Sequence, residues 1–423
     1  MKKMRQKLLS IFAFSALLIS LILPLASCTP TKPETYDYVS DLFSEYDLPK
    51  FDKEKFREAE RIFMKNCAVD MPKAEDHAEA SVSLYLEYYR ESGNLDETDS
   101  AAVTDALLTC YVEAVGDRWA VYRNASEYED YNTNMSGSFY GIGVTVTHDK
   151  KAGTVTVTET YPGYGAALAG ILPGDLITGA DGKTVSGDGY KAVVERLKAP
   201  ETDTVSVTVL RLGEELSFTV TKSNVTQNSV EYSIDENKIG YIKISSFKGN
   251  TASQFREAID FMVDSEAVGI VYDLRANPGG YLASVVSVLS YIAPSDTTIT
   301  SFSDGYAKPK KDNDPHSLSL PSVVICNERT ASAGELFTAA LRDFDEVFGY
   351  FEVTTVGVTT RGKGVMQNSF PLDDGSYVTM TVAYYNPPSG ENYDGIGIEP
   401  NVTVENDADR LSAAYEEIFK LVK

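Results

Sequence analysis

The spacing of apolar residues divides the chain into three regions. Up to about Tyr131, apolar residues recur three and four positions apart, which predicts amphipathic helices. The predicted helices span 51–64, 78–89 and 101–115. From Ser138 apolar and polar residues alternate, which predicts β-strands. Beyond about Ser223, candidate strands and helices follow each other in turn, and this favours an α/β core.

The middle region, 138–222, predicts a small β-rich unit. Strands are expected over 142–147, 154–158, 204–210 and 216–220, and short helices over 165–169 and 188–197. Polar residues between the first two strands indicate a hairpin turn. A unit of this size can bury a core of its own.

The last region predicts alternating elements and two less regular segments. Strands are expected over 239–244, 269–272 and 323–326, and helices over 252–263, 282–291 and 333–341. The polar segment 304–319 is expected to be a mobile loop. Residues 407–423 predict a closing amphipathic helix.

The first residues have the pattern of an export signal. Four Lys and Arg residues among the first seven precede an apolar run over 8–25, and small residues then precede Cys28. This predicts residues 1–27 as a lipoprotein signal peptide and Cys28 as a lipidated N-terminus. The protein would then be extracytoplasmic and anchored to the bacterial cell envelope. A plain signal peptide or a membrane anchor helix, with Cys28 incidental, is the alternative.

Charge and histidine content exclude some classes of function. The formal net charge is −24, and loss of the predicted signal, with four basic residues and no acidic one, would lower it by four to −28. Such a surface repels phosphate backbones, so we expect no nucleic-acid partner. The three histidines, His77, His148 and His316, form no ligand-like cluster, so neither a metal site nor a cofactor is expected.

Three further cysteines fit no zinc or redox motif. Cys326 ends an apolar run and is expected to be a buried strand thiol. Cys67 and Cys110 lie in predicted helices. A disulfide between them and two unpaired core thiols both fit this placement.

A glycine-flanked turn precedes the first strand of the middle region. Around Gly141, Ile142 and Gly143, backbone N–H groups can turn outward, and such a nest can hold a carboxylate. On these residues alone, a simple bend is the alternative.

With the run Ala-Ala-Leu-Ala-Gly-Ile-Leu-Pro-Gly-Asp-Leu-Ile at 166–177, the middle region resembles a PDZ domain over 138–222. PDZ domains bind free peptide C-termini between a strand and a helix. The resemblance implies that the 141–143 turn holds the carboxylate and that 190–197 forms the other wall of the groove.

Three segments of the last region carry candidate chemistry. The first, 273–280, is Asp-Leu-Arg-Ala-Asn-Pro-Gly-Gly between an apolar strand and a helix. Its Pro-Gly-Gly turn exposes backbone N–H groups that can stabilise an oxyanion. The second, 327–335, is Asn-Glu-Arg-Thr-Ala-Ser-Ala-Gly-Glu, where Ser332 has little steric cover and suits a nucleophile. An isolated serine at a helix start is more simply an N-cap residue.

The third segment, 357–367, places Lys363 between two glycines and before a predicted strand, so its amine can point inward. A surface hairpin lysine is the alternative. The segment also nearly spells a nucleotide-binding P-loop. We reject that interpretation because Gly364 replaces the Ser or Thr that would bind magnesium, and because a strand rather than a helix follows.

In this order after a PDZ-like domain, the three segments resemble the S41 family of carboxyl-terminal processing peptidases. The resemblance implies Ser332 as the nucleophile, Lys363 as the general base and Gln367 as the residue that positions the lysine. It also implies an oxyanion hole formed by the backbone N–H groups of Gly280 and Ala333.

The resemblance covers most of 125–402 and implies an α/β multi-domain fold. This fold has an N-terminal helical region, a PDZ-like β-rich domain and a crotonase/ClpP-like α/β protease core. The expected boundaries are 1–27 for the signal peptide, 28–137 for the helical domain, 138–222 for the PDZ domain and 223–423 for the protease core.

The chain departs from the family pattern near the approach to the site. Arg361 stands where the family usually has an aromatic residue, and Arg329-Thr330 replaces a commoner small pair. The interval from Ser332 to Lys363 is also a few residues longer than in the family pattern, with 348–355 as the expected insertion. These departures bear on substrate preference more than on chemistry.

A lysine base makes a physical demand on the fold. A lysine in water has a pKa of about 10.4 and is almost wholly protonated at neutral pH. Burial in apolar surroundings lowers that value, so we predict that Lys363 is buried near Ser332 without a carboxylate partner. A Ser-His-Asp triad is the rival arrangement, with His316, in a polar loop, as its only plausible histidine.

The sequence therefore predicts a serine endopeptidase that holds protein C-termini in its PDZ domain and cleaves through an acyl-enzyme. One alternative is a non-catalytic, lipid-anchored peptide-binding protein on the same scaffold. Another is a structural envelope protein that uses the helical region for dimers. A homodimer is left open.

Overall fold

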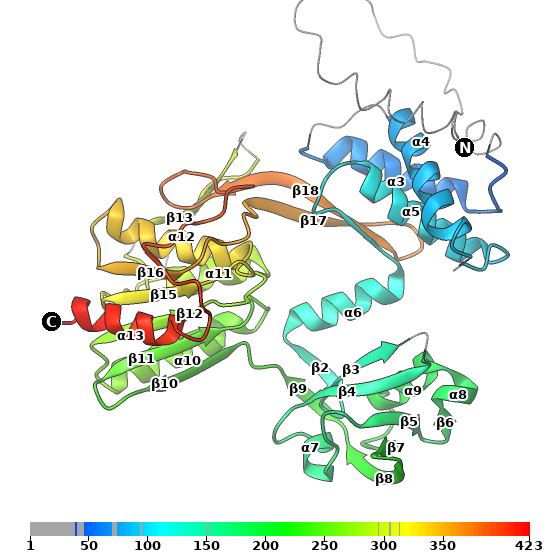
Figure 1. The fold of residues 1–423 in the computed structure, drawn as a ribbon, viewed down its shortest axis with the longest axis horizontal. Helices are drawn as coiled ribbons and strands as arrows, with labels where there is room; N and C mark the ends of the chain where they lie inside the picture. Colours follow the sequence, from blue (N-terminus) through cyan, green and yellow to red (C-terminus); the bar gives the residue numbers. More distant parts are fainter. Residues whose placement is uncertain are drawn as a thin grey trace, which may run out of the picture. The chain divides into compact units, whose positions relative to one another are not determined.

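A computed structural model describes residues 39, 46–69, 74–93, 95–149, 152–294, 296–303, 306–312 and 314–423 (Figure 1). The predicted signal peptide and Cys28 lie outside the described residues. In the described part of the chain, no helix has both the length and the apolar character needed to cross a bilayer. Cys67, Cys110 and Cys326 are free thiols, so the structure selects unpaired cysteines over a disulfide.

The described helical region contains α3 (Lys53–Asn66), α4 (Ala74–Tyr85), a π-helical turn at Leu86–Arg90, and α5 (Ser100–Ala114). Asp52 and Asp99 cap α3 and α5 by accepting hydrogen bonds from backbone N–H groups of the first turn. The buried rings of Phe56 and Phe63 pack edge to face on Tyr111, at centroid distances of 5.2 and 5.7 Å. These aromatic contacts hold α3 against α5.

The helical region is joined to the C-terminal half through a shared sheet. The chain leaves α5 through β1 (Val121–Arg123) and α6 (Ala125–Ser136). β1 pairs antiparallel with β18 (Tyr377–Asn386), which forms a long hairpin with β17 (Val365–Pro371), as Figure 1 shows. β18 also pairs with β13 (Thr298–Phe302), and β13 pairs with β14 (Lys310–Lys311). The prediction of a mobile loop over 304–319 is therefore wrong at β14, because β14 is hydrogen-bonded to β13 in this sheet.

The middle region is an antiparallel sheet in the order β3-β4-β5-β7-β8, with short helices beside it. Its strands are β3 (Val144–Asp149), β4 (Thr154–Thr160), β5 (Leu176–Ala180), β6 (Lys183–Thr184), β7 (Thr204–Arg211) and β8 (Glu214–Thr221). Its helices are α7 (Gly165–Ala169), α8 (Val185–Asp188) and α9 (Tyr190–Lys198). Alternate residues of β4 and β7 are fully buried, which is the pattern of a sheet with one covered face. β2 (Ser138–Gly141) and β9 (Ser223–Thr226) pair as a ribbon where the chain enters and leaves this unit.

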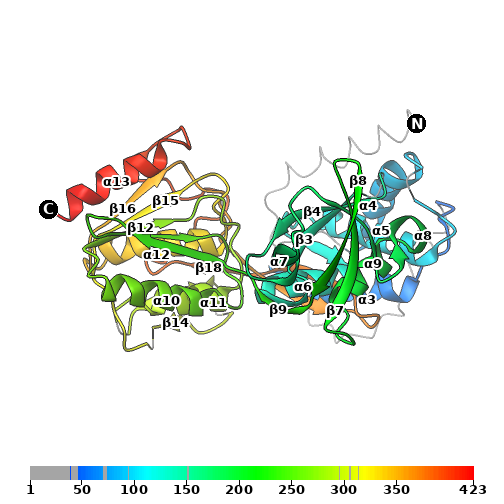
Figure 2. The ribbon, with the colours of Figure 1, turned by 90° about the horizontal axis from the view of Figure 1, so that it is seen from below.

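The last region is a mostly parallel sheet in the order β10-β11-β12-β15-β16-β19. The strands are β10 (Val230–Ile234), β11 (Ile239–Ile244), β12 (Gly269–Asp273), β15 (Ser322–Cys326), β16 (Val353–Gly357) and β19 (Val402–Thr403). The helices are α10 (Thr251–Asp264), α11 (Leu282–Ser290), α12 (Ala333–Glu346) and α13 (Arg410–Leu421). Figure 2 shows α10, α11 and α12 on one face of the sheet and α13 on the other, in agreement with the two buried clusters. β12 and β15 are buried along their whole length, as expected for strands covered on both faces.

The predicted α/β multi-domain fold is confirmed, with a helical region, a β-rich middle unit and an α/β core. The domain boundaries and the crotonase/ClpP-like detail stay predictions.

Candidate active site

Ser332 lies at a sharp turn between a buried strand and a helix. β15 ends at Cys326, and α12 begins directly after the serine. The Ser332 backbone has φ 54° and ψ −118°, a conformation that costs energy in any residue with a β-carbon. Strained strand-to-helix turns of this kind expose a nucleophilic side chain. Ser332 occupies the N-cap position, but without the extended backbone that an ordinary N-cap residue adopts.

The Pro-Gly-Gly turn lies directly against this serine. A β-carbon added to Gly279 would lie 2.7 Å from Ser332 Cβ, so the close approach requires glycine. Phe247 N–H donates to Gly279 O, and Tyr281 N–H donates to Phe247 O, which fixes the turn on both sides. Among the described residues, the N–H groups of Gly280 and Ala333 donate no hydrogen bond. Both are therefore available to a developing oxyanion.

Asn277 connects the Pro-Gly-Gly turn to the turn that carries Ser332. Its side chain is fully buried, donates to Ile244 O at 2.8 Å and accepts from Gly279 N–H at 2.8 Å. Its backbone O accepts from Ala331 N–H at 2.9 Å. A buried amide with its donor and its acceptor both in use holds both turns in a single arrangement.

Lys363 is half-buried on the loop before β17. Its Nζ donates to Gln367 Oε1 at 2.6 Å and lies 4.7 Å from the centroid of the Trp119 ring. The pKa of Lys363 is lowered to about 8, chiefly by burial; the charge of Asp117 opposes this shift, and the charge of Arg361 adds to it. No described carboxylate forms an ion pair with Nζ. The neutral amine is therefore more accessible near neutral pH than that of a lysine in water.

Gln367 is itself oriented by the helical region. Its Nε2 donates to the backbone O of Trp119, so its Oε1 is left to face the lysine. Asp117 fixes the Trp119 segment by accepting from Trp119 N–H at 3.0 Å and from Thr381 N–H at 2.7 Å. The only tryptophan of the chain thus forms a wall of the site. Sequence reasoning missed Trp119 because it lies 248 positions before its partner Gln367.

Glu335 is a second residue whose role the sequence reasoning missed. Its carboxylate is fully buried. One oxygen accepts from Ser332 N–H and Lys363 N–H, each at 2.8 Å. The other accepts from Thr360 Oγ1 and Gly362 N–H, each at 2.6 Å. The available signal was the Ser-x-x-Glu spacing of a capping box at the start of α12.

Ser332 and Lys363 are brought together by their segments but share no direct hydrogen bond in the described structure. Tyr385 bridges them, with its hydroxyl 3.4 Å from Ser332 Oγ and 3.3 Å from the backbone O of Lys363. Lys363 Nζ is directed to Gln367 instead.

The PDZ-like turn keeps two free backbone donors. Gly143 has φ 81°, and a β-carbon there would lie 2.6 Å from Tyr164 Cβ. Among the described residues, the N–H groups of Ile142 and Gly143 donate no hydrogen bond. β3, which follows the turn, is an edge strand, and His148 on β3 stacks on Tyr190 of α9 at 4.3 Å. The turn predicted to hold a carboxylate thus begins a strand that has one free edge.

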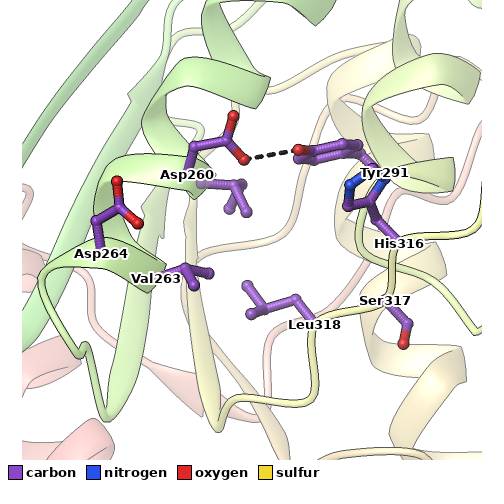
Figure 3. Close-up of a pocket in the computed structure, with 8 residues that line it drawn as sticks. Asp260, Val263, Asp264, Tyr291, His316, Ser317 and Leu318 are labelled. Atoms are coloured by element: carbon purple, nitrogen blue, oxygen red, sulfur yellow. Dashed lines mark hydrogen bonds between the residues drawn. The ribbon is translucent and has the colours of Figure 1, made fainter.

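A pocket of about 340 Å³ lies away from these residues, between α10, the end of α11 and residues 316–318 (Figure 3). None of the predicted catalytic residues lines it. His316 contacts Asp314 and the Tyr291 ring there, with Nδ1 2.6 Å from Asp314 Oδ1. The structure gives His316 no hydrogen bond to Ser332, which disfavours the Ser-His-Asp alternative.

The predicted role of Lys363 as general base implies that the rate of peptide cleavage depends on the protonation of its amine. Because the pKa of Lys363 is lowered to about 8, the neutral fraction, and with it kcat/KM, should rise about tenfold between pH 7 and pH 9. In Gln367→Glu, a carboxylate beside Nζ favours the charged amine, so the rise should shift to higher pH and activity at pH 7 should fall. The measurement is the pH profile of kcat/KM.

Asn368→Asp is the matched control for this prediction. It adds a carboxylate one residue along β17, where the side chain contacts Tyr306 rather than the lysine. Its pH profile should stay close to that of the wild type. If the pH profile of kcat/KM for Gln367→Glu coincides with that of the wild type, Lys363 is not the titrating base.

Known proteins match the two C-terminal regions. Residues 238–404 match the model of peptidase family S41, and residues 156–211 match that of a PDZ domain. The chain is 30% identical over 326 residues to a probable CtpA-like serine protease of Staphylococcus haemolyticus, covering 75% of this chain and 64% of that protein. It is 29% identical over 318 residues to the carboxy-terminal processing protease CtpA of Bacillus subtilis, covering 74% of this chain and 66% of that protein. It thus spans just under two thirds of each relative.

Among solved structures, the photosystem II D1 C-terminal processing protease is similar at 24% identity and a TM-score of 0.48, over 88% of this chain and 98% of that chain. The two family matches follow the chain order expected from the motifs. The resemblance predicted from the sequence is confirmed: in this chain, a region that matches a PDZ domain precedes one that matches peptidase family S41.

Proposed function

We propose that this protein is a serine endopeptidase with a Ser332–Lys363 dyad. The observation that carries the proposal is the environment of the lysine amine, which is half-buried, bound to a neutral amide and lowered in pKa to about 8. A structural lysine gains nothing from such surroundings, whereas a general base near neutral pH needs them.

The dyad would act by acyl transfer. Ser332 Oγ attacks the peptide carbonyl carbon while its proton passes to neutral Lys363 Nζ. The oxyanion that forms accepts hydrogen bonds from the backbone N–H groups of Gly280 and Ala333. Lys363 then gives the proton to the leaving amine as the C–N bond breaks, which leaves an ester on Ser332. Water, deprotonated by the same lysine, hydrolyses the ester and restores the serine.

The PDZ domain would supply substrate selection. An extended peptide can add to the free edge of β3, and its terminal carboxylate can accept from the free N–H groups of Ile142 and Gly143. We infer that proteins with free C-termini are the substrates. The stacked pair His148 and Tyr190 lies between the strand and the helix, so an entering peptide would have to pass beside or displace it.

Cleavage of an unstructured protein with a free or an amidated C-terminus tests this function. The wild-type protein should cleave the free form, and amidation should raise KM because an amide carries no charge for the nest to bind. The rival function, a non-catalytic peptide-binding protein, predicts binding of the free form with no fragments. Fragments that appear equally fast from both forms would reject C-terminal recognition while retaining the protease.

We also propose lipid anchoring at Cys28 in the bacterial cell envelope, from the sequence pattern described above. Cys28→Ser should move the protein from the membrane fraction to the soluble fraction. Unchanged fractionation would reject the anchor.

A further inference from the structure

We propose that Arg361 is a specificity-determining residue, which binds a carboxylate of the substrate beside the scissile bond. This inference rests on the proposed function and names the chemistry of its substrate. Arg361 lies two residues before Lys363 in the sequence, so a cation lies next to the proposed base.

The backbone of Arg361 is fixed between the two catalytic segments. Its N–H donates to Thr330 O at 3.0 Å, two residues before the nucleophile. The next residue, Gly362, donates to the buried carboxylate of Glu335. Arg361 therefore lies two residues before Lys363, and its backbone contacts a residue that lies two positions before Ser332.

The guanidinium of Arg361 lies over the same aromatic ring as the catalytic amine. It is 5.6 Å from the Trp119 centroid, and Lys363 Nζ is 4.7 Å from it. Stacking on an aromatic face orients the planar guanidinium but leaves its N–H edge free to donate. Since the side chain is exposed, a bound peptide can reach that edge.

No described residue neutralises this guanidinium. Arg118 lies over the same ring at 4.6 Å, but it donates to Gly362 O at 2.9 Å and pairs with Asp394 at 3.1 Å. Arg361 has no such hydrogen bond or ion pair within the described ranges, although the chain has a net charge of −24. An arginine stays charged at any working pH, so the unpaired cation attracts an anionic group from the substrate.

The geometry of a guanidinium selects the ligand. Its N–H fork matches a carboxylate through two parallel hydrogen bonds. Two sources carry this group, namely the side chain of Asp or Glu near the cleaved bond and the α-carboxylate of a chain that ends within a few residues of it. The charge of Arg361 also disfavours protonation of the neighbouring lysine, so the same cation is compatible with the base.

Pairs of peptides that differ only by Glu or Gln test the inference. Each pair carries the exchange at one position from three residues before to three residues after the scissile bond, with free and with amidated C-termini. In the wild type, kcat/KM should favour Glu over Gln at one position by about tenfold. The Glu/Gln ratio should fall to near one in Arg361→Gln and Arg361→Phe, and to an intermediate value in Arg361→Lys.

Arg256→Gln is the matched control. Arg256 is an exposed arginine of α10 whose guanidinium lies 5.3 Å from the centroid of the Tyr291 ring and 3.4 Å from Asp314, away from the predicted catalytic residues. It should keep the wild-type ratio. Each ratio is taken within one variant, so a change in overall activity cancels. Thermal unfolding of every variant is measured to show that each is folded.

The outcomes separate the two hypotheses. If the Glu/Gln ratio of kcat/KM is the same in the wild type and in Arg361→Gln, Arg361 does not bind a substrate carboxylate. This holds even if Arg361→Gln shifts the pH profile. A preference that depends on Arg361 but requires a free C-terminus assigns the carboxylate to the chain end, and one that persists on amidated peptides assigns it to Asp or Glu. Absence of any cleavage by the wild type refutes the proposed function instead.

Discussion

Ser332→Ala and Lys363→Ala should each lower kcat/KM for peptide cleavage by about ten-thousand-fold. In the proposed mechanism, the serine supplies the attacking oxygen and the lysine accepts its proton. No residue that contacts Lys363 Nζ can replace it as the base, because Gln367 and Trp119 carry no basic group. Lys363→Arg should be equally inactive, since a guanidinium remains charged and cannot accept a proton.

The double variant Ser332→Ala/Lys363→Ala decides whether the two residues act as a unit. Its activity should equal that of either single variant, because groups that share one step are not additive. Lys243→Ala, a lysine of β11 that pairs with Glu231, is the matched control and should keep full activity. If Lys363→Ala retained activity within tenfold of the wild type, another residue would be the base.

Glu335→Gln should be the most damaging change outside the dyad, with a loss of about 2–4 kcal/mol of unfolding free energy. Each carboxylate oxygen accepts two hydrogen bonds, from Ser332 and Lys363 on one side and from the Thr360–Gly362 stretch on the other. An amide NH₂ in place of either oxygen would face two donors. We expect kcat to fall about a hundredfold, because the serine and lysine loops lose their common anchor.

The pH profile distinguishes this positioning role from an electrostatic one. The negative charge of Glu335 raises the pKa of Lys363, so its removal alone would lower that pKa and increase activity at pH 7. A fall in kcat at every pH indicates positioning. Glu328→Gln is the control, since this exposed carboxylate forms long ion pairs with Arg329 and Arg410 and its loss should change stability by less than about 0.5 kcal/mol.

Many element positions could be predicted because their causes are local. The strand predicted over 239–244 and the helix predicted over 165–169 match β11 and α7 to the residue. Apolar periodicity and glycine turns act within a few residues, so they can be read without the fold. β1 and β14 were not predicted, because short strands form only when a distant strand offers hydrogen bonds.

The sequence alone was enough to identify the segments expected to carry chemistry, namely the Pro-Gly-Gly turn, the Ser332 turn and the Lys363 loop, and to place them after a PDZ domain. The roles given to individual residues stay predictions. Only the tertiary structure placed Trp119 against Lys363 and joined the serine and lysine loops through Glu335. The physical reason is that a lowered pKa and a shared buried anchor depend on neighbours distant in the chain, and local pattern does not encode which neighbours meet.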